Sequence, residues 1–189
     1  TVGILIGLFM GIARICRLRI FRLIAAVYVD FFRGTPLLVQ IFLVYFALPL
    51  LTGQRSDPYV AAISACGLNS GAYVAEIFRS GIQSIPRGQY EAAEVLGYSS
   101  RQTFQRIVLP QVVKRVLPAM GNEVVTLVKD TSLAFSLGVL EMFTQARAIV
   151  TSQRTMAAFA VAALIYWVTC LIIEYIMRRI EKKLDYYHD

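Results

Sequence analysis

Residues 91–110 read EAAEVLGYSSRQTFQRIVLP, a polar helical segment set into an otherwise apolar chain. Gly97 favours a left-handed end to a first short helix, because glycine has no Cβ to clash in that conformation. Ser99 and Gln102 have the spacing of a capping box, which satisfies backbone N–H groups at the start of a second helix. Pro110 is expected to end that second helix, because an interior proline removes a hydrogen bond. The segment therefore predicts two short helices that work outside the bilayer, on another protein.

The composition around this segment is that of a membrane protein. The chain has 189 residues, of which 57% are hydrophobic and 16% charged, and its mean hydropathy is +0.60. A soluble domain usually has about a quarter charged residues. We expect one integral membrane domain, residues 1–189, with the polar loop at about 84–110.

Apolar stretches of near-spanning length predict an all-α helical bundle with about five transmembrane helices. A span needs roughly 20 residues, and the first stretch offers only about a dozen, so we expect the sequence to begin inside a truncated first helix. Residues 20–32 are expected to form an amphipathic elbow helix on the membrane surface. The five stretches are 1–13, 34–52, 58–78, 112–128 and 156–177.

Basic residues sort the connections between these stretches into two faces. Fifteen Lys and Arg residues belong to one face and four to the other. Because cytoplasmic loops carry the excess of positive charge, the N-terminus is predicted outside, and the C-terminus and the 84–110 loop inside. The larger set is Arg14, Arg17, Arg19, Arg22, Arg33, Arg79, Arg87, Arg101, Arg106, Lys114, Arg115, Arg178, Arg179, Lys182 and Lys183, and the smaller is Arg55, Lys129, Arg147 and Arg154.

Several function classes lack their sequence features. The net charge of +7 does not form a basic stripe interleaved with aromatics, so we expect no nucleic-acid partner. His188 is the only histidine and the three cysteines are scattered, so no metal site and no histidine-based catalytic triad are expected. No phosphate-binding glycine loop occurs, so the chain should not hydrolyse ATP itself.

Polar side chains in the third apolar stretch are candidates for a translocation lining. Asn69, Tyr73 and Glu76 share one helical face, and polar groups are costly against lipid, so this face should point into the bundle. The alternative is a helix-packing face with interhelical hydrogen bonds, with Gly67 and Gly71 as a pair of small residues. Glu76 could instead pair with Arg79 as a structural element.

A second group of polar candidates interrupts the chain after residue 128. A charge at the bilayer centre costs about 2.5–3.5 kcal/mol, so Lys129 and Asp130 should lie at the outer interface or face a polar cavity. An interrupted span can mark a solute site in transporters. An outer loop with a short re-entrant helix is equally compatible. The candidate solute residues here are Asp130, Thr131, Ser132 and Glu141.

The 91–110 segment resembles the EAA loop of permease subunits in ATP-binding-cassette importers. The family pattern is met without a change in spacing, and it places a coupling helix in a cleft of the ATPase subunit. The resemblance therefore implies that Arg87, Glu91, Ala92, Ala93 and Gly97 couple this chain to an ATPase. The matching residues are Glu91, Ala92, Ala93, Gly97, Ile107, Leu109 and Pro110.

Further motifs resemble the polar amino-acid branch of that family, among them FRGTPLLVQ at 32–40, LNSGAYVAEI at 68–77 and VKDTSLA at 128–134. The resemblance implies a multi-pass protein of the cell membrane that pairs with a second permease subunit, identical or homologous. It also implies a dimeric cytoplasmic ATPase, which would carry ATP and Mg, an extracytoplasmic solute-binding protein and a polar amino acid as substrate. No cofactor is expected on this chain. The alternatives are a permease for another small solute, a channel subunit, or a membrane-embedded enzyme using Asp130 with Ser132.

Overall fold

The computed structural model describes residues 2–16 and 18–184, and this part of the chain is helical without a strand. Thr1, Arg17 and His188, which figured in the sequence predictions, lie outside the described residues. The elements are α1 (Val2–Ile15), α2 (Arg19–Gly34), α3 (Leu37–Thr52), α4 (Pro58–Gln83), α5 (Arg87–Val95), α6 (Ser100–Thr103), a π-helical segment (Phe104–Val108), α7 (Leu109–Asp130), a 3-10 helix (Thr131–Leu137), α8 (Met142–Gln153) and α9 (Ala157–Leu184).

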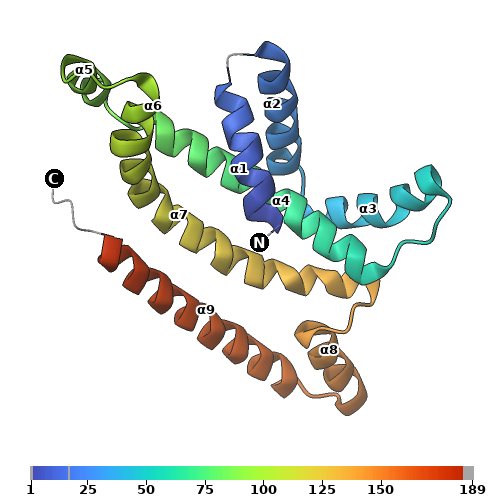
Figure 1. Ribbon diagram of the computed structural model, residues 1–189. Coiled ribbons are helices and arrows are strands. Elements are labelled where there is room, and N and C mark those ends of the chain that lie inside the picture. Colours follow the sequence, from blue (N-terminus) through green and yellow to red (C-terminus); the bar gives the residue numbers. More distant parts are fainter. Residues whose placement is uncertain (1, 17, 185–189) are drawn as a thin grey trace.

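The long helices α4, α7 and α9 lie side by side, and α1 and α2 pack as a pair against α4 (Figure 1). α5 and α6 lie at one end of this arrangement, here called the α5 end, and α8 lies at the other. The all-α prediction is confirmed, and the five predicted stretches correspond to α1, α3, α4, α7 and α9. The predicted elbow at 20–32 forms α2.

The lengths of the helices support a membrane protein. Among the described residues, α4 and α9 are long and apolar enough to cross a bilayer. Two further spans are possible if two consecutive helices joined at a bend are counted as one span. The first such pair is α2 with α3, which meet at a bend of 113°. The second joins the continuous stretch from α6 to Leu137 with α8, at a bend of 55°. α1 is apolar but shorter.

Small residues let α1 approach α4 closely. A Cβ added to Gly71 would lie 2.8 Å from the Tyr28 hydroxyl and 3.2 Å from the Gly3 carbonyl oxygen, so Gly71 is a packing residue. Gly67, by contrast, has no neighbouring atom within 4 Å of such a Cβ. The Gly67 carbonyl oxygen would nevertheless lie 3.0 Å from a Cβ added to Gly3, so both glycines lie where α1 packs on α4, although only Gly71 has neighbours where its own Cβ would be.

Gly7→Ala is expected to destabilise the protein by about 1–2 kcal/mol, since the new methyl group would overlap Val74 and lie 2.8 Å from the Gly71 carbonyl oxygen. The gain in helix propensity, about 1 kcal/mol, offsets only part of this overpacking. The matched control is Gly67→Ala, where only the gain in helix propensity applies. This variant should therefore be stabilised, whereas Gly7→Ala should be destabilised. Thermal unfolding of the purified protein measures both, and equal shifts would contradict close packing at Gly7.

An ionic cluster joins α1, α2 and α4 toward the α5 end. Glu76 accepts from Arg14 Nη1 at 2.6 Å and from Arg79 Nε at 2.9 Å, and Arg33 Nη1 lies 3.9 Å away. The Glu76 side chain is 20% exposed. The expected pairing of Glu76 with Arg79 is confirmed, and Arg14 and Arg33 extend it to two further helices.

The prediction that Pro110 ends a second short helix is wrong. α6 continues through the π-helical segment into α7 without a break. The Leu109 N–H donates to the Phe104 carbonyl, five residues back, and Pro110 lies in the first turn of α7. Because the helix is continuous there, Pro110 lacks one backbone hydrogen bond, and the widened π-turn just before it accommodates the proline.

Candidate coupling helix and solute cavity

α5 and the turn after it have the local geometry that the sequence predicts. Gly97 has φ +77°, and its N–H donates to the Glu94 carbonyl at 2.9 Å. Ser99 and Gln102 form the full capping box of α6. Both caps are made by backbone and short side chains, so the turn between α5 and α6 holds a fixed angle.

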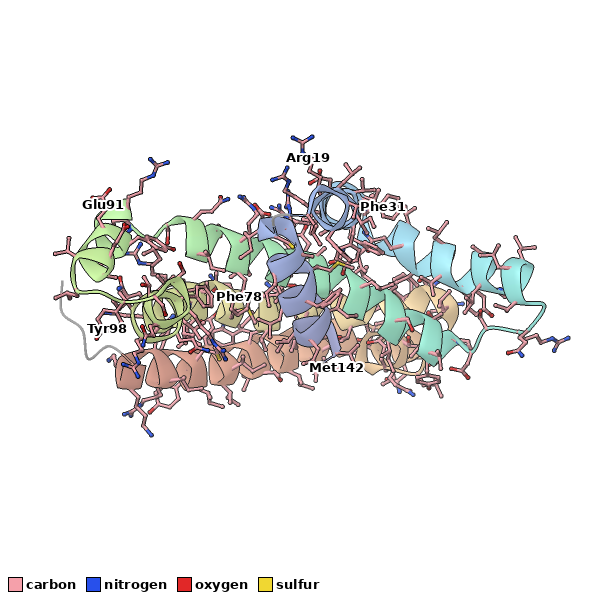
Figure 2. All side chains as sticks on the ribbon, turned by 45° about the horizontal axis from the view of Figure 1, so that its top comes forward. Arg19, Phe31, Phe78, Glu91, Tyr98 and Met142 are labelled. Atoms are coloured by element: carbon pink, nitrogen blue, oxygen red, sulfur yellow. The ribbon has the colours of Figure 1, made fainter. Side chains whose placement is uncertain are left out.

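The outer surface of α5 combines charge with exposed apolar side chains. Val95 is 87% and Leu96 72% exposed, and Glu91 lies on the exposed surface beside them. Figure 2 shows Glu91 and Tyr98 together at the α5 end, far from Met142. Two large apolar side chains so exposed on a short polar helix are typical of a protein-binding surface.

Ala92 and Ala93 differ in their surroundings. Ala92 is exposed, whereas Ala93 is 1% exposed and covered by the chain itself. The small side chain of Ala93 lets α5 pack close to its own chain, whereas Ala92 leaves an open side. Arg87 begins α5 and is exposed.

α5 and the end of α4 that precedes it are both fastened to α7. Gln111 on α7 donates to Gln89 at 3.2 Å, and Arg115 on α7 donates to Ser84 Oγ at 3.1 Å. An apolar cluster lies under these contacts and connects the end of α4 with α7. Its buried members are Ile85, Val108, Val112 and Val116. α5 is therefore bonded to α7, next to the place where the end of α4 is bonded to the same helix.

A cavity of about 530 Å³ lies among α1, α4, α7 and the 3-10 helix. Its wall is mainly apolar, and its polar members come from four different elements. Glu123 of α7 is among them. The polar and thiol side chains of the wall are Tyr59, Cys66, Ser70, Glu123, Thr131 and Glu141.

The solute candidates from the sequence are divided between several places. Thr131 and Glu141 line the large cavity. Ser132 lines a second cavity of about 430 Å³ with Lys129 and Tyr166. Asp130 belongs to neither wall. Sequence reasoning missed Cys66, and it did not single out Ser70 and Glu123 as partners, because they come together only when α4 packs on α7.

Asn69 and Tyr73 lie outside both cavities. Asn69 is buried and donates to the Phe32 carbonyl at 3.1 Å and to Gln40 Oε1 at 3.0 Å. These bonds fasten α4 to the bend between α2 and α3. Tyr73 is 37% exposed, and the Arg33 guanidinium lies 5.4 Å from its ring centroid.

Glu141 stabilises the start of α8 and also lines the 530 Å³ cavity. Its carboxylate accepts from the backbone N–H groups of Phe143 and Thr144, each at 2.6 Å, and so caps the start of α8. Tyr166 on α9 donates to the same carboxylate at 3.3 Å. The acid therefore fixes the outer connection to α9 while it faces the cavity.

Spanning helices around a cavity, with a short exposed helix outside the apolar part, are typical of a membrane transport subunit. The chain belongs to the family described as the binding-protein-dependent transport system inner membrane component, whose model matches residues 3–186.

Relatives of known role support this assignment. The chain is 39% identical over 189 residues to the L-cystine transport system permease protein TcyL of Bacillus subtilis, covering 96% of this chain and 79% of the relative. It is 38% identical over 184 residues to the glutamine transport system permease protein GlnP of Escherichia coli K12, covering 96% and 84%.

Solved structures agree with the fold. A crystal structure of an amino acid ABC transporter with histidines superposes with a TM-score of 0.89 at 33% identity, covering 96% of this chain and 85% of that chain. An inward-facing structure of the MetNI methionine ABC transporter superposes with a TM-score of 0.77 at 17% identity, covering 96% and 85%, and this shows the shared fold alone.

Proposed function

We propose that this chain is the membrane permease of an ATP-driven importer of polar amino acids. The observation that carries the proposal is the exposed α5–Gly97–α6 unit on a chain that superposes almost throughout on an amino acid transporter. Cystine and glutamine permeases among its relatives point to the same class of substrate.

In the proposed mechanism, α5 docks on a separate cytoplasmic ATPase, which binds ATP and Mg and works as a dimer. Val95 and Leu96 would enter an apolar cleft, while Arg87 and Glu91 would pair with charges at its rim. Ala92 would allow close approach, and Ala93 and Gly97 would set the angle of α5. The chain itself would bind no cofactor.

Movement of α5 would switch the access of the cavity from one side of the membrane to the other. The bond between α5 and α7 and the bond between the end of α4 and α7 support this, because α4 and α7 both contribute to the cavity wall. The importer would contain a second permease, identical or homologous, and would receive its solute from an extracytoplasmic binding protein. Such alternating access is a rigid-body transition biased by two sites.

The 530 Å³ cavity is the proposed solute site. Its volume falls within the roughly 300–1,000 Å³ of small-molecule sites. Glu123 would attract the ammonium group of an amino acid, and Thr131 and Glu141 would add hydrogen bonds. Asp130 and Ser132 would act from outside this cavity, along the path of the solute. Asn69 and Tyr73 would act indirectly, by holding α4 against α2 and the bend that follows it.

The test is uptake of a panel of radiolabelled amino acids into proteoliposomes that contain the complete importer with its binding protein. ATP-dependent uptake of one or a few polar amino acids is expected. Glu123→Gln should lower that uptake at least tenfold, through the loss of a charged hydrogen bond. Glu174→Gln, at an exposed ion pair with Arg178, is the control. Absence of uptake across the panel would refute the substrate class, and normal uptake by Glu123→Gln would refute the site.

A further inference from the structure

α2 has three distinct faces. Ala25 and Val29 are fully buried against the rest of the chain. A second face, about a quarter turn or more away, exposes large apolar side chains, with Leu23 65%, Val27 61% and Phe31 44% exposed. A third face carries two pairs of polar residues, each pair three residues apart and the two pairs about two helical turns from each other. Its members are Arg19, Arg22, Asp30 and Arg33, all exposed.

The axis of α2 crosses the long helices steeply. α2 meets α3 with a bend of 113°, and in Figure 2 it is seen almost end-on while α4, α7 and α9 run across the view. Arg19 and Phe31 leave the helix in different directions in that view. If α4 crosses the bilayer, α2 therefore lies nearly in the plane of the membrane.

Its depth follows from the contacts of its ends. A helix rises about 1.5 Å per residue, so Glu76 and Arg79 lie about 27 and 32 Å along α4 from Pro58. The hydrocarbon core is about 30 Å thick. Arg33 of α2 and Arg14, just before α2, both reach Glu76. Tyr28 and Phe32 of α2 are bonded to Leu68 and Asn69, about 15 and 17 Å along α4, so the helix lies from the middle of the span toward the α5 end. Its arginine side chains reach the boundary that the charge distribution places in the cytoplasm.

Positive charge at this level exceeds negative charge. Arg14, Arg33 and Arg79 share the single carboxylate of Glu76. Within the described residues, Arg19 and Arg22 have no ion pair or hydrogen bond from their side chains. An interfacial helix with a basic face and an exposed apolar face binds anionic phospholipid through both.

We propose that α2 binds anionic phospholipid of the cytoplasmic leaflet. Arg19 and Arg22 contact the phosphate-bearing headgroup, and Leu23, Val27 and Phe31 contact the acyl chains. The ligand chemistry is that of a diacyl anionic lipid rather than of free phosphate, because the apolar face adjoins the basic one.

The first experiment measures lipid retention. The purified complete importer is titrated with dioleoylphosphatidylglycerol and followed by native mass spectrometry, with inorganic phosphate as a comparison. Each arginine near an anionic surface strengthens binding about fivefold, so Arg19→Gln with Arg22→Gln should weaken phosphatidylglycerol binding about thirtyfold. The control, Arg55→Gln with Arg154→Gln, removes two exposed charges remote from α2 and should leave this binding unchanged. Equal losses in both double variants, or binding of phosphate alone, would overturn the proposal.

The second experiment tests which molecule covers the exposed apolar face of α2. The Val27→Trp substitution is made together with Trp167→Phe, so that residue 27 is the only tryptophan of the chain. The importer is then assembled with partner subunits whose tryptophans have been replaced. In nanodiscs, brominated phosphatidylglycerol should quench its fluorescence. A second copy of this chain is the competing occupant, and it would instead protect the indole and give Val27→Cys disulfide cross-links between permeases. Protection with such cross-links would refute lipid binding at this face. Neither readout depends on which solute is carried.

Discussion

Gly97→Asp should uncouple ATP hydrolysis from uptake while the protein still inserts and folds. The φ of +77° costs a residue with a side chain roughly 1–2 kcal/mol, so the turn should relax and α5 should lose its fixed angle. No atom lies within 4 Å of an added Cβ, so the failure does not come from a clash in the core. Uptake per ATP hydrolysed should fall about tenfold or more, measured with the complete importer in proteoliposomes.

A graded series separates backbone conformation from charge. Asn adopts the left-handed conformation more readily than other residues with side chains, so Gly97→Asn should retain more coupling than Gly97→Asp, and Gly97→Val should retain the least. Gly88→Ala is the control, because Gly88 also has open space but no positive φ. Full coupling in Gly97→Val would mean that the angle of α5 has no part in transmission.

Local chemistry explains why the α5–α6 turn was predictable from the sequence. Gly97, Ser99 and Gln102 act on backbone groups within a few residues, so their spacing alone carries the information. The continuation past Pro110 was not predictable in the same way. A π-helical turn depends on which carbonyl accepts the Leu109 N–H, and no side-chain pattern encodes that choice.

Contacts between residues distant in sequence explain why the rest of the candidate site was not predicted. The wall of the large cavity joins Ser70 of α4 with Glu123 of α7 and Glu141 before α8, and no periodicity within one helix connects them. Asn69 looked like a lining residue from its helical face alone. Its burial against Gln40 depends on the bend between α2 and α3, which the Gly-Thr-Pro turn allows but does not orient.

The Glu76 cluster is the strongest case of such long-range dependence, and its removal should have a large effect on stability. Glu76→Gln leaves Arg14 and Arg79 without a counter-charge, with side chains only 18% and 26% exposed. Exposed pairs contribute about 0–1 kcal/mol, and loss of one partner from a buried pair costs about 3–5 kcal/mol. For this half-buried cluster we expect a loss of about 2–3 kcal/mol, or about 4–12 °C in the midpoint of thermal unfolding.

Size-exclusion chromatography after heating measures that midpoint in detergent-purified protein. Glu174→Gln is the matched control, because Glu174 pairs with Arg178 on one helix and the arginine is 73% exposed. Its midpoint should change by less than about 2 °C. Adding Arg14→Gln to Glu76→Gln should restore part of the loss, since one uncompensated cation is removed. If Glu76→Gln were as mild as Glu174→Gln, three arginines from three helices would be held in place by packing alone, and the cluster would not fix α1 and α2 on α4.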